Sequence, residues 1–219
     1  MKETWRWFGP HDPISLEQII QAGAQGVVTS LAHIPTGKPW GLEDVLERKA
    51  DIERNGLSWS VVESVPVHND IKTRSGDFLA HIENYKISLR NLGQAGVEVV
   101  CYNFMPVVDW TRTNLLYELP NSARALRFEM TDFAAYDVFL LCRENAQQDY
   151  SPEVLARAKV RVDEMSQEEQ QLLEKNIIAG LPGGEGSYDR AGILQAITTF
   201  IELGTQGLRE NLFAFLREV

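Results

Sequence analysis

Apolar and polar positions follow a repeating order from the start of the chain to Pro106. A stretch with apolar residues three or four positions apart leads to a glycine, then to a short apolar run, then to a proline. This order occurs in "SLEQIIQAGAQGVVTSLAHIP", in "LEDVLERKADIERNGLSWSVVESVP" and in "DFLAHIENYKISLRNLGQAGVEVVCYNFMP". Glycine suits the end of each helical stretch because it enters the left-handed region without a steric clash. Helices and strands that alternate in this way are typical of βαβ units with a parallel sheet.

Four strands are predicted in this part of the chain, at 4–9, 26–31, 57–65 and 97–104. Each of them leads into a loop that contains a proline. In a parallel α/β fold such loops lie at the carboxyl ends of the strands, where active sites are built. No dinucleotide motif Gly-x-Gly-x-x-Gly follows the first strand, and the phosphate-binding motif Gly-x-x-x-x-Gly-Lys-Ser/Thr does not occur. We therefore expect a (β/α) barrel rather than a nucleotide-binding fold.

The repeating order breaks after Thr113, and residues 114–187 are predicted to form an insertion. Within it, "ARALRFEMTDFAAYDVFLL" fits either a pair of strands or a strand followed by a helix. Two helices are predicted from "SPEVLARAKVRVDEM", which begins with a serine cap and a proline, and from "SQEEQQLLEKNIIAG", which begins with a capping box and ends near Gly180. "LPGGEGSYD" predicts a loop, and an apolar stripe predicts a helix from about 190 to the last residue.

A complete (β/α)8 barrel has eight strands, and the pattern predicts four. The expected fold class is therefore α/β, with the first four βα units of a TIM (β/α)8 barrel forming a half barrel and an insertion after the fourth strand. Residues 1–219 would make the N-terminal half of a single barrel domain. The outer strands of such a half barrel would have open edges, which favour association with copies of the chain or with a second half.

Composition narrows the classes of partner. The 219 residues are 44% hydrophobic and 24% charged, which is typical of a soluble globular protein, and the formal net charge is −10. Nucleic acid and anionic membranes both require a basic face, so neither is expected as a partner. The sequence shows no 18-residue apolar stretch and no signal-peptide pattern, and its two cysteines suggest free thiols. A cytoplasmic location is expected from these features.

Polar and charged residues gather in the loops after the four predicted strands. They are Arg6, His11, Asp12, His33, Lys38, Glu63, His68, Asp70, Lys72, Asn103, Asp109 and Arg112. Loops are polar in most proteins, so any single one could simply be solvated, but the repetition at four strand ends favours a polar site. Glu63 lies in the otherwise apolar "VVESVP", where a carboxylate requires a polar site or a cationic partner. Neither a His-x-x-x-His nor a Cys-x-x-Cys pair occurs, so the spacing predicts no metal site.

Seven stretches of the sequence resemble mannonate dehydratase, an enzyme of hexuronate breakdown. They are "TWRWFGP", "QAGAQGVVTSLAHIP", "GLSWSVVESVPVHNDIKT", "VVCYNFMPVVDWTRT", "ALRFE", "NIIAGLPG" and "LRENLFAFL". The resemblance runs in order from the first residues to the last. It implies a TIM barrel that removes water from D-mannonate to give 2-dehydro-3-deoxy-D-gluconate in glucuronate catabolism, with Mn²⁺ or Fe²⁺ as the cofactor.

The resemblance also sets limits on the site. The family's chains are nearly twice as long, and their metal ligands lie in strands of the second half, so no residue of this chain is expected to be one of those ligands. The strand-end residues are expected to form the substrate side of the site: Arg6, His33, Glu63, His68, Asn103, Asp109 and Arg112. In this interpretation the two arginines meet the carboxylate or hydroxyls of the sugar acid, while Asn103 and Glu63 bind hydroxyls.

Three interpretations remain open at the level of sequence. The first is the N-terminal portion of a mannonate dehydratase, which alone lacks the metal site. The second is a non-catalytic half barrel that associates with itself. The third is a metal-dependent sugar isomerase or epimerase on the same barrel, which product analysis with mannonate and a panel of aldoses would distinguish.

Overall fold

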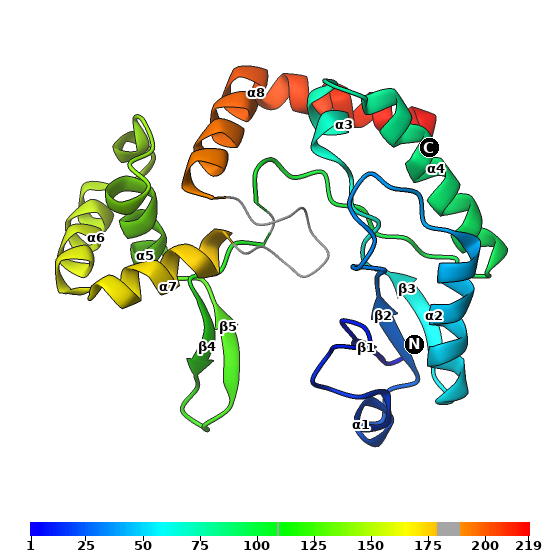
Figure 1. Cartoon of the computed structure of the whole chain (residues 1–219). Helices are drawn as coiled ribbons and strands as arrows, with labels where there is room; N and C mark the ends of the chain where they lie inside the picture. The colour runs from blue at the N-terminus through cyan, green and yellow to red at the C-terminus, as the bar shows by residue number, and fades with distance from the viewer. Residues whose placement is uncertain (109, 179–188) are drawn as a thin grey trace. The chain divides into compact units, whose positions relative to one another are not determined.

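The computed structural model describes residues 1–108, 110–178 and 189–219, and these form two compact units. The first unit contains Met1–Pro106 and Phe200–Val219. The second contains the described residues between 107 and 178 together with 189–199. The helix end predicted at Gly180 lies outside the described residues, and so does the loop predicted at 181–189 except for its last residue, Asp189. Figure 1 shows the elements of both units.

A parallel sheet forms the centre of the first unit. Its strands are β1 (Thr4–Arg6), β2 (Gly26–Thr29) and β3 (Ser58–Val62), in the order β1-β2-β3. Both pairs are parallel, as the βα pattern predicts, so this unit has an α/β fold. Val27 and Val62 are fully buried because helices cover the sheet.

The strands are shorter than the apolar runs suggest, and the loops explain why. The first strand ends early because the carboxylate of Asp12 accepts hydrogen bonds from the backbone N–H groups of Phe8 and Ile14, which turns the chain. The predicted fourth strand is reduced to a single parallel bridge between Val62 and Val100. Beyond that bridge, Tyr102 and Phe104 pack instead against the ring of Phe215.

Four helices occur in the chain before residue 107. They are α1 (Leu16–Gln21), α2 (Leu42–Arg54), α3 (Asn69–Thr73) and α4 (Phe78–Gln94). Ser15 and Gln18 form a capping box at the start of α1, and buried Ile52 of α2 and Leu92 of α4 join the core around Val27. The short helix α3 was not expected from the sequence.

The last helix completes the core of the first unit. Helix α8 (Arg190–Glu218) is interrupted at Gly204, which has φ 68° and ψ 169° and is therefore outside helical geometry. In its C-terminal part, Phe215 is buried edge-on against Tyr85, with ring centroids 5.1 Å apart. The Asn211 side chain donates to the carbonyl of Lys72 at 2.8 Å. This part of α8, red in Figure 1, therefore lies against α3 and α4.

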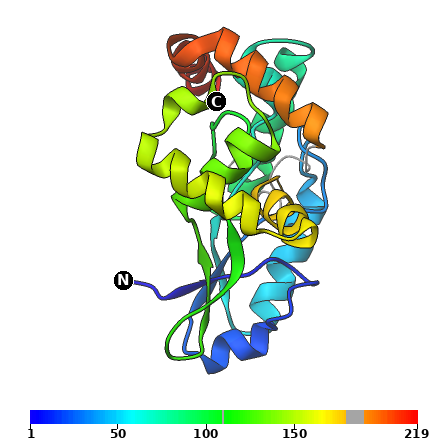
Figure 2. The same cartoon turned by 90° about the vertical axis from the view of Figure 1, so that its left-hand side faces the viewer.

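The second unit begins with an antiparallel hairpin of β4 (Asn114–Glu118) and β5 (Arg124–Arg127), whose strands lie side by side in Figures 1 and 2. The segment that the sequence left open is therefore a strand followed by helical turns. These turns and the helices after them are α5 (Met130–Ala134), a π-helical segment (Ala135–Leu140), a 3₁₀ turn (Ala146–Asp149), α6 (Pro152–Glu164) and α7 (Gln167–Ile178).

The two helix starts predicted here are confirmed. Ser151 caps α6, with Pro152 at its first position, and Ser166 and Glu169 form the capping box before α7. A small core of Tyr136, Leu173, Ile177 and other apolar residues holds these helices together. That 114–187 interrupts a single barrel domain stays a prediction. In the part of the chain that the structure describes, no helix combines the length and the apolar character needed to cross a membrane.

Candidate functional site

Three of the predicted site residues lie at the carboxyl end of the parallel sheet. Arg6 is the last residue of β1, Glu63 directly follows β3, and Asn103 follows the bridge at Val100. Burial lowers the pKa of Arg6, while the nearby charges of Glu63 and Asp12 oppose that change. The Arg6 Nη1 atom is buried and has no hydrogen-bond partner among the described residues. An unpaired guanidinium donor can bind an oxygen of an incoming anion.

Backbone and hydroxyl groups hold this edge in place. Ser30 donates its hydroxyl to the carbonyl of Ser64 at 2.8 Å, and the Asn103 amide donates to the Ser64 hydroxyl at 3.3 Å. The pKa of the Cys101 thiol is raised, mainly by burial and in addition by the negative charge of the nearby Glu63 carboxylate. A raised pKa keeps the thiol of Cys101 protonated over a wider pH range and so makes it less reactive.

His33 borders an open cleft of about 440 Å³ beside α2. Its other lining residues include His11, Arg48 and Asp51. The guanidinium of Arg48 is buried, donates to the carbonyl of Ser30 at 3.0 Å and lies 5.4 Å from the centre of the Trp7 ring. Burial lowers the pKa of Arg48, while Asp51 and Glu47 oppose this. The cleft thus has a fixed cation in its wall.

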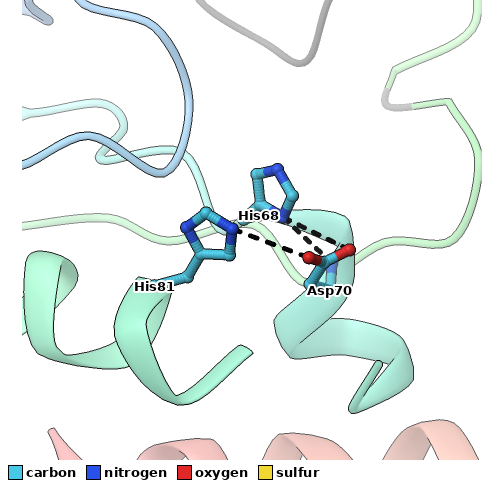
Figure 3. A group of neighbouring side chains, drawn as sticks. All are labelled: His68, Asp70 and His81. Carbon is cyan, nitrogen blue, oxygen red and sulfur yellow. Dashed lines mark hydrogen bonds and ion pairs between the residues drawn. The ribbon is translucent and has the colours of Figure 1, made fainter. Parts of the chain in front are cut away.

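His68 belongs to a separate group with Asp70 and His81, shown in Figure 3. His68 precedes α3 and its Nδ1 accepts the backbone N–H of Asp70 at 3.1 Å. His81 comes from the first turns of α4, and its ring stacks on that of His68 with centroids 3.8 Å apart. Burial lowers the pKa of His68 and His81 adds to this, whereas Asp70 opposes it. The ring of His68 is accordingly suited to remain neutral and to accept the amide hydrogen.

The last two predicted residues are placed differently. Arg112 belongs to the second unit, where its guanidinium donates to the carbonyl of Trp110 and lies 5.7 Å from the centre of the Trp110 ring. Asp109 lies outside the described residues. The structure therefore brings Arg6, Glu63 and Asn103 to one edge and His33 and His68 to two neighbouring loops of the first unit, and the shared role of Arg112 and Asp109 stays a prediction.

Comparison with known proteins identifies the relationship. The family model of D-mannonate dehydratase (UxuA) matches residues 1–219. The chain belongs to the D-mannonate dehydratase family. It is 67% identical over 219 residues to mannonate dehydratase of Saccharophagus degradans, 54% to mannonate dehydratase 2 of Agrobacterium fabrum and 50% to mannonate dehydratase of a Marinomonas species.

The whole chain is covered in these three alignments, but only 55% of the first two relatives and 56% of the third. The chain thus spans about half the length of the curated relatives it matches. The crystal structure of mannonate dehydratase from Streptococcus suis serotype 2 is also similar, with a TM-score of 0.56 and 40% identity over 84% of this chain and 50% of that one. Membership of the D-mannonate dehydratase family and an α/β fold are both supported by these matches.

Sequence reasoning missed two groups of residues in this member of the D-mannonate dehydratase family. Arg48 follows Val45 by three positions and precedes Ile52 by four, so its place on the buried face of α2 could have been recognised. The grouping of Asp70 and His81 with His68 could not, because His81 follows His68 by thirteen positions and the unpredicted α3 lies between the two histidines. Among the described residues, these three are the group that could hold a metal ion.

Proposed function

We propose that this chain provides the substrate-side half of a mannonate dehydratase, built as the first four βα units of a TIM (β/α)8 barrel. Family membership over the full chain and the parallel order β1-β2-β3 support the architecture. The reaction would be dehydration of D-mannonate to 2-dehydro-3-deoxy-D-gluconate in the breakdown of hexuronates. The two free cysteines suit a reducing cytoplasm.

The observation that carries this proposal is the unpaired Nη1 of Arg6 at the strand end. A sugar acid would supply the missing acceptor, since a carboxylate pairs well with a guanidinium. Glu63 and Asn103, at the same edge, would accept from and donate to the sugar hydroxyls. His33, His68, Asp109 and Arg112 would complete the wall of the site.

The reaction removes a proton next to the substrate carboxylate and releases the neighbouring hydroxyl. A bound divalent ion, Mn²⁺ or Fe²⁺ by family resemblance, would stabilise the negative charge that develops at that carboxylate. We propose that the family's catalytic metal ligands lie outside this chain, in the part of the curated relatives that it does not span. This chain would then bind and orient the sugar acid, through Arg6 above all, and would require a second half for turnover.

Reconstitution tests this division of labour. The 219-residue chain is assayed for loss of D-mannonate with Mn²⁺ or Fe²⁺, alone and mixed with a polypeptide covering the remaining half of the Saccharophagus degradans relative. We expect turnover only in the mixture, and at least a tenfold rise in KM when Arg6→Gln is used. Arg54→Gln is the matched control, because Arg54 is an exposed arginine on α2 away from this edge.

Two outcomes would favour the alternatives. A chain that remains inactive in the mixture and forms oligomers with itself would support the non-catalytic half barrel, whose β1 edge pairs with no other strand in the described sheet. Conversion of aldoses in place of D-mannonate would support an isomerase or epimerase on the same barrel.

A further inference from the structure

His68, Asp70 and His81 form the most distinctive chemical group of the first unit outside the strand ends. One ligand atom from each lies within 4.8 Å of those of the other two. Figure 3 shows a nitrogen of each imidazole directed toward the carboxylate of Asp70. Two histidines and one carboxylate are a donor set used by proteins for divalent transition metals.

The hydrogen bonds around the group determine which ring nitrogens hold lone pairs. The backbone N–H of Asp70 can only donate, so the Nδ1 of His68 that receives it carries a lone pair. The carbonyl of Gly37 can only accept, so the Nδ1 of His81, 3.3 Å away, carries the proton. The Nε2 of His81 is consequently the unprotonated nitrogen of the neutral ring. Histidines that bind a metal through one ring nitrogen commonly donate the N–H of the other to a carbonyl in this way.

The remaining distances place electron-rich atoms opposite one another. The Nε2 of His81 lies 3.6 Å from Oδ2 of Asp70, and the Nδ1 of His68 lies 3.7 Å from Oδ1. Both separations are too long for a hydrogen bond. Two ligands each bound about 2.1 Å from one tetrahedral metal ion would lie roughly 3.4 Å apart. The spacing therefore suits a shared cation better than direct contact.

Two glycines make room for these side chains. Gly37, at φ +83°, faces the imidazoles so closely that a Cβ atom there would lie 2.7 Å from Nδ1 of His81 and 3.0 Å from Cδ2 of His68. Gly76, at φ +50°, leaves space in the same way for the carboxylate of Asp70. A cavity of about 10 Å³ borders both imidazoles, which is close to the volume needed for one water-sized occupant.

We propose that His68, Asp70 and His81 bind one divalent transition-metal ion of the Zn²⁺ class. His81 supplies Nε2 and Asp70 supplies a carboxylate oxygen. His68 supplies Nδ1, whose hydrogen bond from the backbone N–H of Asp70 is broken when the ion binds. Such an ion would fix α3 to the start of α4. Mg²⁺ is disfavoured, because it prefers six oxygen ligands.

Binding is measured on the untagged 219-residue chain, freed of metal by a chelator. Zn²⁺ is titrated calorimetrically, and Co²⁺ is titrated with detection of its visible absorption. We expect one ion per chain, at least tenfold weaker binding for His81→Gln and for Asp70→Asn, and no change for the exposed His11→Gln. Failure of Zn²⁺ to bind, unchanged affinity in both site variants, or equal affinity for Mg²⁺ would overturn the proposal.

A measurement on the wild-type chain avoids any dependence on how the variants fold. The chain has four histidines, so their ring signals in NMR spectra can be assigned completely. Sub-stoichiometric Co²⁺ should broaden the signals of His68 and His81 before those of His11 and His33. Broadening confined to His11 and His33 would show that the ion binds elsewhere. Neither experiment uses D-mannonate, so its result is independent of the proposed dehydratase activity.

Discussion

The two units differ in what lies at their centres. In the first, apolar side chains of strands and helices pack around Val27 and Val62, and the buried guanidinium of Arg48 donates to the backbone carbonyl of Ser30. In the second, the carboxylate of Asp137 is buried and accepts from Arg143 at 2.8 and 2.7 Å and from the hydroxyl of Tyr150 at 2.8 Å. The first unit is thus specified by a hydrophobic pattern, and the second also by one set of polar partners.

Removal of the central carboxylate should produce the largest effect. Asp137→Ala leaves Arg143 and Tyr150 without their shared acceptor and should cost about 3–5 kcal/mol of unfolding free energy, measured by urea denaturation. Asp149→Ala is the control, since this carboxylate also pairs with Arg143 but is 61% exposed, and it should cost at most about 1 kcal/mol. Equal losses in the two variants would contradict a special role for the buried pair.

A cavity in the first unit should cost somewhat less. Leu92→Ala removes a fully buried side chain of α4 and is expected to destabilise by about 3 kcal/mol, because apolar burial is lost and a void remains. Leu79→Ala on the same helix is the matched control, since Leu79 is 66% exposed, and should change stability by less than about 0.5 kcal/mol. Urea midpoints of both variants decide this.

The fold of the first unit could be predicted from the sequence better than that of the second, because the first unit is specified by a hydrophobic pattern and the second also by polar partners. Glycines at positions 23, 56 and 96 all have positive φ after their helices, so the βα order could be recognised from local chemistry. The pairing of Asp137 with Arg143 depends on a π-helical segment, which has no simple hydrophobic period.

The arrangement of the candidate site could be predicted from the sequence only in part. The positions of Arg6, Glu63 and Asn103 at one edge could be predicted because strand ends follow from the apolar runs, while their role in binding stays a prediction. The partnership of His68 with His81 was not found, because it requires knowing that the short helix α3 folds back toward α4.

Alkaline pH should lower the stability of both units by similar amounts, which are smaller than the effects of the two core substitutions. Burial raises the pKa of Tyr85 in the first unit and of Tyr136 in the second. Well below pH 10, the usual pKa of tyrosine, each phenol is protonated in both the folded and the unfolded state. As the pH rises further, the unfolded chain loses the proton first, so the folded state loses stability, by at most about 0.8 kcal/mol per tyrosine at pH 10.5.

The variants Tyr85→Phe and Tyr136→Phe should each reduce the loss in stability between pH 8 and pH 10.5, as measured by urea denaturation. The hydroxyl of Tyr136 is buried without a hydrogen-bond partner among the described residues, so Tyr136→Phe should not destabilise the chain at pH 8. An unchanged pH dependence in both variants would show that these phenols ionise as easily in the folded chain.

Thiol reactivity should give the smallest difference between the units. Burial raises the pKa of Cys101, whereas Cys142 is exposed in the second unit. At pH 8, Cys142 should react with Ellman's reagent about threefold faster or more, since the thiolate is the reactive form. The single variants Cys101→Ser and Cys142→Ser assign the two rates, and a faster reaction at Cys101 would contradict its described surroundings.

The π-helical segment at Ala135–Leu140 has a consequence for how this region can evolve. A π-helical turn is an α-helix that has gained one residue, so deletion of one residue here would restore α-helical hydrogen bonds. Everything after the deletion would turn by about 100° relative to Asp137, and the guanidinium of Arg143 would point away from its carboxylate. The number of residues in this segment is therefore as necessary to the ion pair as the two charged side chains themselves.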